Sequence, residues 1–200
     1  MKSIDFYYSI GSRYSYLAHS RMAGLERDFG VAVRWRPLDS AALMKAVGRT
    51  PFAGPPPSTQ YDPGYRSIDA ERWARFYGIP YREPDWARID FARVNMAVVA
   101  AADQADPQAY SRALFALAFE RGARAIDDAA LRAAADSAGL DAARLIRDID
   151  AEETAARHHA TIEAALAAGV FGVPSFVIGT QMYWGNDRIA LLRHHLAETR

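Results

Sequence analysis

The chain has 200 residues, half of them hydrophobic, with 24 basic and 24 acidic side chains and no cysteine. This length allows one domain with a sizeable core, or one domain that carries a large insertion. The balanced charge gives no reason to expect nucleic acid or an acidic membrane as a partner. Without cysteine, disulfides, thiolate zinc sites and cysteine nucleophiles are excluded.

No segment has the character of a membrane span or a signal peptide. The apolar run MAVVAAA stops at Asp103, short of the roughly 20 apolar residues that a span needs. Asp5 lies where a signal peptide would require an apolar stretch. We therefore expect a soluble protein of the cytoplasm, without a membrane partner.

The first elements are predicted to be a strand, a helix and a second strand. Residues 5–10 are aromatic and apolar, as is typical of a strand. From Ser12 to Gly30 the apolar residues recur with helical spacing, so Ser12 is the natural N-cap and Gly30 ends the helix. Residues 31–39, VAVRWRPLD, alternate like a second strand that stops near Pro37.

The middle of the chain is predicted to be a loop followed by helices alone. Residues 48–64 are rich in proline and glycine, which is typical of a loop. Helical patterns follow, several of them ending at a glycine. They cover residues 66–78, 90–104, 107–122, 127–139 and 141–168.

The last elements are predicted to be a β-hairpin and a helix. Residues 173–185 contain two short strand-like runs separated by Gly179-Thr180, which is a hairpin signal. The helix that closes the chain would have Asn186 as its N-cap. Strands thus lie at both ends of the sequence, and together they would form one mixed sheet with a helical lobe beside it.

This order of elements, together with four sequence stretches, resembles the DsbA-like branch of the thioredoxin fold, specifically 2-hydroxychromene-2-carboxylate isomerases and kappa-class glutathione transferases. The stretches are FYYSIGSRYSYLA, IDAERWARFYGIPY, VNMAVVAA and GVFGVPSFVIGTQMYWGNDR. The resemblance implies an α/β fold with a thioredoxin-like mixed four-stranded sheet and a large helical insertion. Residues 1–65 and 169–200 would form the thioredoxin-like domain, and residues 66–168 the inserted helical domain. The family also implies a homodimer.

Ser12, at the start of the first predicted helix, has two interpretations. An N-cap hydroxyl accepts a hydrogen bond from a backbone N–H and contributes about 1 kcal/mol. In the family that the chain resembles, a serine takes the place of the redox cysteine and glutathione supplies the sulfur. A hydroxyl that donates to a thiolate contributes about 1.5–3 kcal/mol and a helix N-terminus about 0.3–1 kcal/mol, which together lower a thiol pKa near 8.5 by roughly 1.3–3 units. The resemblance makes Ser12 the catalytic residue and glutathione the cofactor.

Two C-terminal segments are implied to bind glutathione together with Ser12. A cis bond between Val173 and Pro174 would leave the Val173 backbone free to pair with the cysteinyl unit in strand fashion, although a trans bond is ordinary for proline. In the segment Trp184-Gly185-Asn186-Asp187, the asparagine caps the last helix and the aspartate complements its dipole. Alternatively, this helix N-terminus takes the γ-glutamyl carboxylate and Asp187 the ammonium group, and the two roles can coexist.

Four further residues are candidates for contact with a small aromatic carboxylate substrate. Met44 and Lys45 lie where the isomerases place substrate-contacting residues, and a cation there suits a carboxylate, whereas a surface lysine is ordinarily a solvated charge. Trp86 would wall the same pocket. Asn95 matches an asparagine of the family, with a hydrogen-bonded buried amide as the alternative.

The histidines are not expected to bind metal. The adjacent pairs His158-His159 and His194-His195 point about 100° apart on a helix, unlike the i,i+4 spacing of a helical metal site. Solvated helix faces explain all four. We therefore expect no metal.

The chain departs from the family at two places. Arg13 replaces the usual proline of the turn, and its cation either lowers the thiol pKa further or points into solvent. Between residues 48 and 64, the family's substrate asparagine and its lysine for the glycyl carboxylate are both missing, and only Arg49 and Arg66 lie in or near this segment. Weak glutathione binding, or a different thiol or substrate, would follow.

The sequence thus favours a glutathione-dependent isomerase that converts 2-hydroxychromene-2-carboxylate, or a similar intermediate of aromatic degradation, to trans-o-hydroxybenzylidenepyruvate by reversible thiolate addition. A kappa-like transferase acting on electrophiles is one alternative. A non-catalytic thioredoxin-fold binding protein is the other. The motifs GVPS and WGND argue against it, and the missing asparagine and lysine argue for it.

Overall fold

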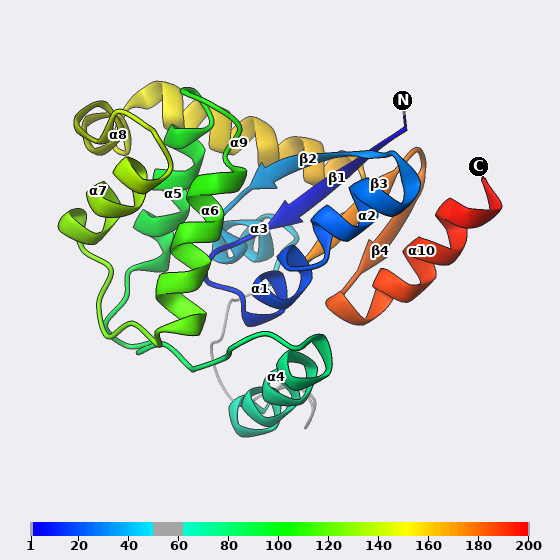
Figure 1. The fold of residues 1–200 in the computed structure, drawn as a ribbon. Helices are drawn as coiled ribbons and strands as arrows, with labels where there is room; N and C mark the ends of the chain where they lie inside the picture. The colour runs from blue at the N-terminus through cyan, green and yellow to red at the C-terminus, as the bar shows by residue number, and fades with distance from the viewer. Residues whose placement is uncertain (1, 50–61, 200) are drawn as a thin grey trace.

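A four-stranded sheet forms the centre of the computed structural model, which describes residues 2–49 and 62–199 (Figure 1). Its strands come from both ends of the chain: β1 Ser3–Tyr8, β2 Ala32–Pro37, β3 Ser175–Ile178 and β4 Gln181–Trp184. Their order is β2-β1-β3-β4, with β1 parallel to β2 and antiparallel to β3, and β4 antiparallel to β3. The predicted mixed sheet and its hairpin are therefore confirmed.

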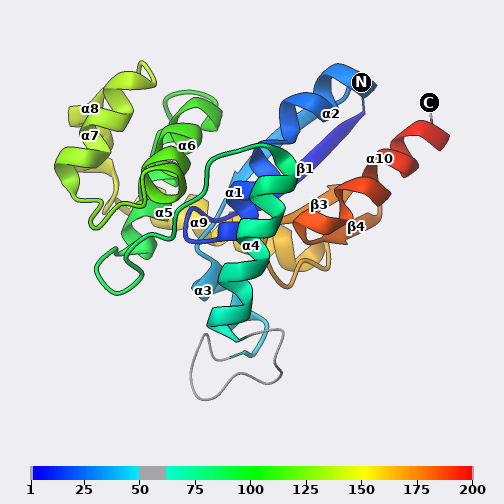
Figure 2. The same ribbon diagram turned by 60° about the horizontal axis from the view of Figure 1, so that its bottom comes forward.

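Helix α1, Arg13–His19, follows β1 after a short turn, and α4, Pro63–Tyr77, lies across it (Figure 2). The two helices are in contact, and the small residues Ala70 and Ala74 of α4 are buried. The Tyr14 hydroxyl, on α1, donates to Asp69 of α4 at 2.9 Å. Because Tyr14 is two residues past Ser12, α4 packs beside the turn between β1 and α1.

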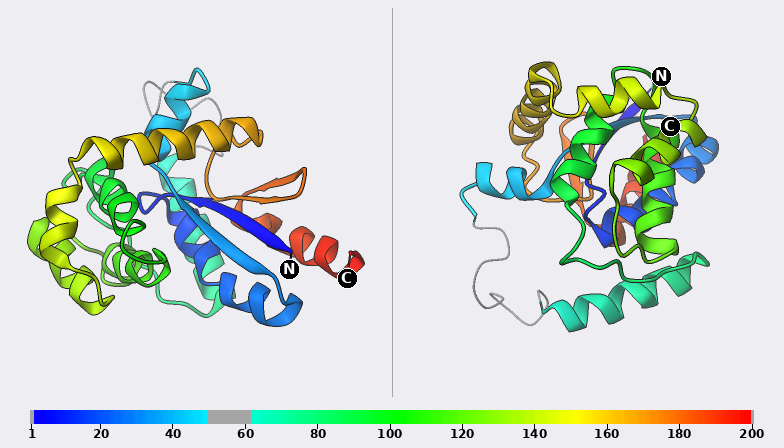
Figure 3. Two further views of the ribbon diagram at one scale, coloured as in Figure 1. Left: turned by 90° about the horizontal axis from the view of Figure 1, so that it is seen from above. Right: turned by 90° about the vertical axis from the view of Figure 1, so that its left-hand side faces the viewer.

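Helices cover both faces of the sheet (Figure 3, left). Successive side chains of a strand point to opposite faces, so a strand with consecutive apolar residues needs cover on both. On β1, Ile4, Phe6 and Tyr8 join the main core, while Tyr7 belongs to a smaller cluster with residues of α3 and α9. The first face is covered by α1, α2 Met22–Phe29 and α10 Ile189–Glu198, and the second by α3 Ser40–Ala46 and α9 Glu152–Ala167.

A lobe of helices lies beside the sheet, at the left of Figure 1. It consists of α5 Phe91–Ala101, α6 Gln108–Phe115, a π-helical turn at Ala116–Glu120, α7 Asp128–Ser137 and α8 Ala142–Asp148. Its buried side chains, among them Val98, Leu114 and Leu131, belong to the same core as Phe6 of the sheet. The lobe is therefore packed against the sheet through one shared core.

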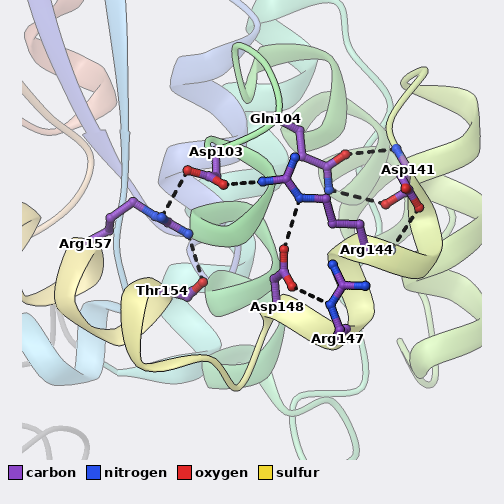
Figure 4. A network of polar contacts seen from close by, with 8 residues as sticks. All are labelled: Asp103, Gln104, Asp141, Arg144, Arg147, Asp148, Thr154 and Arg157. Atoms are coloured by element: carbon purple, nitrogen blue, oxygen red, sulfur yellow. Dashed lines mark hydrogen bonds and ion pairs between the residues drawn. The ribbon is translucent and has the colours of Figure 1, made fainter.

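A network of charged side chains joins the end of α5 to α8 and α9 (Figure 4). Asp103 accepts from Arg144 at 2.5 Å and from Arg157 at 3.1 Å. Arg144 also donates to Asp148 at 3.2 Å. These side chains are 23–42% exposed, so each pair contributes about 0–1 kcal/mol.

Two of the predicted helices are each broken into two. The pattern over residues 12–30 forms α1 and α2, because the chain makes a tight turn in which the Ser20 hydroxyl donates to the Leu17 carbonyl at 2.7 Å. The pattern over residues 141–168 forms α8 and α9, separated by a second tight turn in which Ala151 donates to the Asp148 carbonyl. Neither turn contains proline or glycine, so the helical spacing alone did not predict the breaks.

Helix α3 has no counterpart in the prediction. It begins after Asp39, whose side chain accepts the Ala42 N–H at 2.9 Å and caps the helix. Of the loop predicted for residues 48–64, the structure describes only the two ends, and Pro63 and Gly64 already belong to α4. Within the described ranges, no helix is both long and apolar enough to cross a membrane.

Candidate active site

The turn between β1 and α1 is built around Ser12. Its backbone is extended, with φ −129° and ψ 114°, and its Oγ accepts the Ser15 N–H at 3.2 Å, so the predicted N-cap is confirmed. Its own N–H donates to the Ser9 carbonyl at 3.1 Å. A serine hydroxyl has one donor hydrogen besides its lone pairs, and this hydrogen has no acceptor within the described part of the chain. Capping and donation to a bound thiolate are therefore compatible.

Asn95, on α5, supports this turn from the lobe, and it is 1% exposed. Its Oδ1 accepts the Ile10 N–H at 2.7 Å, while its Nδ2 donates to the Ser9 hydroxyl at 2.9 Å and to Asp39 at 3.5 Å. Of the two roles that the sequence leaves open for Asn95, the structure favours the buried, hydrogen-bonded amide, which fixes the end of β1.

The Val173–Pro174 peptide bond is cis, as predicted. The register of β1 with β3 pairs Tyr7 with Ser175, so Val173 lies at the end of β1 that leads into the Ser12 turn. Val173 forms no backbone hydrogen bond among the described residues. The backbone of Val173 is therefore free to pair with a peptide-like ligand.

Trp184 packs directly beside this backbone. Its ring centre is 5.0 Å from that of Phe171, and a Cβ at Gly172 would come within 2.7 Å of its indole nitrogen. The indole is 39% exposed. Gly172, which lacks a side chain, thus lets Trp184 approach the chain next to Val173.

Asn186 corrects one prediction, because it does not cap the last helix. A 3-10 turn, Asn186–Arg188, precedes α10, and no side chain in the described ranges caps that helix. The reason is position: α10 begins only at Ile189, so Arg188 and not Asn186 occupies the cap position. Asn186 is 3% exposed, and its Nδ2 has no partner among the described residues. The 3-10 turn contacts α1. An unpartnered buried amide beside α1 offers a hydrogen bond to a polar group of a ligand.

The next residue, Asp187, is more accessible than Asn186. Its side chain is 44% exposed and pairs with Arg188 at 3.0 Å. Gly185 has φ 111°, and a Cβ there would collide with the Asp187 carboxylate. This glycine therefore allows the carboxylate to lie back against the chain beside Asn186.

Arg13, directly after Ser12, does not point into solvent. Its side chain is 11% exposed, its Nη2 lies 3.3 Å from Oε2 of Glu83, and its guanidinium lies 4.9 Å from the centre of the Trp86 ring. Glu83 also accepts from the Tyr81 hydroxyl and from Nε1 of Trp86, each at 2.5 Å. The cation of Arg13 is thus paired, an arrangement that neither of the sequence-based alternatives described.

Trp86 belongs to a group of aromatic rings on the same side of the turn. Its ring centre is 5.3 Å from that of Phe91 and 5.8 Å from that of Phe119, and it is 39% exposed. Phe91 packs on Gly11, where an added Cβ would come within 2.9 Å of the Phe91 Cβ. The glycine before Ser12 therefore lets an aromatic wall close on the turn.

Met44 and Lys45 lie on α3, which packs with α9 on the sheet face opposite α1. Met44 is half-buried and Lys45 is exposed. The structure brings neither of them into the Arg13–Trp86 group. A contact of these two residues with substrate stays a prediction.

Two of the four paired histidines, His158 and His195, are half-buried and so not on solvated faces, and the His195 ring lies edge-on to that of Tyr183 with ring centres 6.1 Å apart. His158 is half-buried, and its Nε2 accepts the Asp39 N–H at 3.0 Å, so that part of the prediction is wrong. Burial lowers the pKa of His158, which favours the neutral acceptor. His159 and His194 are exposed, each beside a glutamate one turn away. Among the described residues no group of three or more side chains is arranged to hold a metal.

The two arginines near the predicted loop differ in their surroundings. Arg49 is exposed, whereas the Arg66 guanidinium lies 5.5 Å from the centre of the Tyr14 ring. Burial and the nearby Asp69 carboxylate raise the pKa of Tyr14 to about 12, so this hydroxyl stays a neutral donor. Most of the segment that lacks the family's asparagine and lysine, residues 50–61, lies outside the described residues.

The comparisons with known proteins agree with this geometry. Residues 3–197 match the family described as the DSBA-like thioredoxin domain, so the chain belongs to the DsbA-like thioredoxin family. Two curated proteins named 2-hydroxychromene-2-carboxylate isomerase are similar over nearly their whole length. The Pseudomonas putida protein is 29% identical over 94% of this chain and 91% of its own. The Sphingobium xenophagum protein is 30% identical over 98% of this chain and 99% of its own. These similarities group the chain with the isomerases.

A solved structure and a more distant relative support the same grouping. The structure of a 2-hydroxychromene-2-carboxylate isomerase matches with a TM-score of 0.83 and 28% identity, covering 98% of this chain and 95% of that one. Human glutathione S-transferase kappa 1 is 24% identical over 98% of this chain and 92% of its own. The resemblance inferred from the four sequence stretches is confirmed.

Sequence reasoning missed Glu83, Tyr81 and Asp39 as neighbours of the Ser12 turn. Glu83 and Tyr81 lie in a connection without helix or strand, so no periodic pattern points to them. Asp39 carried a usable signal, since an aspartate before a run of helix-forming residues is typical of an N-cap.

Proposed function

We propose that this chain is a glutathione-dependent isomerase of the cytoplasm that acts on 2-hydroxychromene-2-carboxylate or a similar carboxylate of aromatic degradation. The observation that carries the proposal is the Ser12 turn, where a capping serine keeps its hydroxyl hydrogen free beside the unpaired backbone of Val173. The unpartnered amide of Asn186, next to α1, adds a third polar group. Together these groups fit a γ-glutamyl-cysteinyl ligand whose thiol lies at Ser12.

Each residue then has a defined task in the reaction. When bound, glutathione would supply a thiolate that adds reversibly to the conjugated double bond of the chromene or its ring-opened form. Once the hemiketal C–O bond of the ring has opened, giving the phenol and the ketone, the resulting single bond can rotate, and expulsion of the thiolate gives trans-o-hydroxybenzylidenepyruvate. Ser12 donates its hydroxyl hydrogen toward the sulfur, and the N-terminus of α1 favours the negative charge. Val173 pairs with the cysteinyl backbone through its free edge. Asn186 and Asp187 hold the γ-glutamyl group, with the ammonium replacing Arg188 as the partner of Asp187.

Two further properties belong to this proposal. The cytoplasm keeps glutathione reduced, as the reaction requires. The proposed homodimer is supported by α4, which exposes the apolar side chains Tyr65, Ile68 and Phe76 by 48%, 49% and 78%, because exposed apolar groups of this kind mark protein contacts. Light scattering on the purified protein should give the mass of two chains, and a single chain's mass at micromolar concentration would contradict the dimer.

Calorimetric titration with glutathione, followed by an isomerisation assay, tests the function. We expect saturable binding, and turnover of 2-hydroxychromene-2-carboxylate only when glutathione is present. Failure to bind at millimolar glutathione would support the non-catalytic binding protein instead. Binding together with conjugation of 1-chloro-2,4-dinitrobenzene, but without isomerisation, would support the kappa-like transferase, the second candidate because of the human relative.

A further inference from the structure

The Ser12 turn carries a cation, Arg13, at the first residue of α1. A free cation there would lower the pKa of a neighbouring thiol, in the same direction as the Ser12 hydroxyl and the helix N-terminus. The structure pairs this cation instead. Arg13 and Glu83 approach to 3.3 Å, with side chains only 11% and 26% exposed, so water screens the pair less than it screens a surface pair.

Glu83 is itself held in place by two donors. Its carboxylate oxygens accept from the Tyr81 hydroxyl and from Nε1 of Trp86, each at 2.5 Å. The Trp86 ring in turn lies against the Arg13 guanidinium. Burial and Glu83 itself raise the pKa of Tyr81, so its hydroxyl remains a donor. These two hydrogen bonds hold the carboxylate of Glu83 opposite Arg13.

The other charges near the turn have partners of their own. From α4, Asp69 accepts from Tyr14, and Arg66 lies over the Tyr14 ring. Asp39, before α3, accepts from the Ala42 N–H and from Asn95. At the start of the 3-10 turn, Asp187 pairs with Arg188. In the segment that carries Glu83, Asp85 pairs with Arg88 at 3.5 Å.

We propose that Glu83 is a positioning residue that compensates the charge of Arg13 and thereby sets, together with Ser12, the pKa of a thiol at the turn. Glu83 acts through Arg13 and does not touch the thiol. Arg13 then contributes packing against Trp86 but little net charge, so the thiolate depends on the Ser12 hydroxyl and the helix N-terminus. The importance of this pairing for the reaction rests on the proposed function. The effect of the pairing on a thiol pKa at the turn does not depend on that function.

The absence of cysteine from the chain allows a direct test. In a Ser12→Cys variant, the single thiol of the protein lies at the turn, and its pKa can be read from the ultraviolet absorbance of the thiolate or from the pH dependence of alkylation. This measurement needs no glutathione. A failure of the inference is therefore distinguishable from a failure of the proposed function.

Removing one charge of the pair should shift this pKa in a direction set by its sign. An unpaired charge within about 10 Å changes a thiol pKa by about one unit at an effective dielectric constant of about 20. In the Ser12→Cys background we expect Glu83→Gln to lower the thiol pKa by about one unit and Arg13→Gln to raise it by about one unit. The variant with both changes should return close to the parent value. Asp85→Asn, which removes a carboxylate paired with Arg88 instead, is the matched control and should leave the pKa unchanged.

An equal thiol pKa in the parent and in Glu83→Gln would overturn the inference. Glu83→Gln leaves Arg13 buried and unpaired, which can prevent folding. In that case the remaining two variants decide. A raised pKa in Arg13→Gln that returns to the parent value in the double variant supports the inference, and a double variant as high as Arg13→Gln overturns it.

Discussion

Arginine–carboxylate pairs occur in two regions of this molecule, in very different surroundings. In the lobe, Asp103, Arg144 and Arg157 form a chain of contacts with side chains 37–42% exposed (Figure 4). At the turn, Arg13 and Glu83 are 11% and 26% exposed. The same chemical pair is therefore screened by water in the first region and largely removed from it in the second.

This difference shows that burial, and not the number of contacts, decides what such a pair does. Exposed surface pairs contribute about 0–1 kcal/mol each. Removing one partner of a buried pair costs about 3–5 kcal/mol, because the other charge is left without water or partner. The lobe network thus joins helices but adds little to the free energy of unfolding. The pair at the turn, in contrast, changes the electrostatic surroundings of Ser12.

The largest effect is expected from Ser12→Ala, which removes the hydroxyl group that is proposed to stabilise the thiolate. The lost cap costs about 1 kcal/mol of a stability near 5–15 kcal/mol, so the chain still folds. Losing a hydrogen bond to a charged sulfur, about 1.5–3 kcal/mol, should lower glutathione-dependent isomerisation roughly ten- to hundred-fold near neutral pH. Ser20→Ala, at the other end of α1, is the control because its hydroxyl donates only to the Leu17 carbonyl. Equal rate losses in Ser12→Ala and Ser20→Ala would contradict a specific role of the Ser12 hydroxyl in the reaction.

Asp187→Ala tests the exposed pair of Asp187 and Arg188. Unlike the carboxylates of the lobe, Asp187 is proposed to exchange its arginine for the ammonium group of glutathione. Losing a charge-assisted contact of about 1.5–3 kcal/mol should weaken glutathione binding roughly ten- to hundred-fold. Arg188→Ala removes the competing cation at 3.0 Å and should leave binding equal or tighter. Both are measured by calorimetric titration. If Asp187→Ala binds as the wild type does, Asp187 serves only as the partner of Arg188.

His19 tests the effect of burial on a titratable group that has no carboxylate partner among the described residues. Its ring centre is 4.7 Å from that of Phe115, and burial lowers the pKa of His19 from 6.5 to about 4. Below about pH 6.5 the unfolded chain binds a proton that the folded chain does not bind until about pH 4. The free energy of unfolding should therefore fall as pH falls through this window, on the order of 2 kcal/mol by about pH 5. Urea unfolding of wild type and His19→Gln measures this, and identical pH dependence in the two would contradict it.

The smallest effect is expected from Asp103→Asn, which weakens two pairs of the lobe at once. Because these pairs are exposed, the free energy of unfolding should change by less than about 1 kcal/mol. Isomerisation should be unaffected, since Asp103 lies in the lobe network and not at the turn. Urea unfolding and the activity assay check both expectations. A loss of several kcal/mol would show that the lobe network is as consequential as the pair at the turn.

The sheet was predictable because its signals are local. The cap at Ser12, the glycine at residue 30 and the turn at Gly179-Thr180 each mark a boundary within a few residues of sequence. The breaks near residues 20 and 150 were not predictable, because ordinary helix-forming residues occupy them and the tight turns are fixed by how α1, α2, α8 and α9 pack. The failure of Asn186 to cap α10 has a similar origin, since the 3-10 turn that moves the start of α10 to Ile189 packs against α1.

The candidate site was predictable where a motif carries it and not where the fold assembles it. Ser12, Val173 and Asn186 stand in stretches that resemble a known family. The pairing of Arg13 with Glu83 joins two segments far apart in sequence, and neither segment contains a feature that indicates its partner. The contacts of Asn95 with Ser9 and Ile10 are likewise products of tertiary structure.

The central claim is that the Ser12 hydroxyl stabilises the thiolate of bound glutathione. The most direct measurement is the pKa of the glutathione thiol when bound, taken from the ultraviolet absorbance of the thiolate at saturating glutathione in wild type and Ser12→Ala. We predict a value roughly 1.3–3 units below that of the free thiol in the wild type, and a rise of roughly 1–2 units in Ser12→Ala. An equal pKa of the bound thiol in the two proteins would contradict the claim and leave Ser12 as the N-cap of α1 alone.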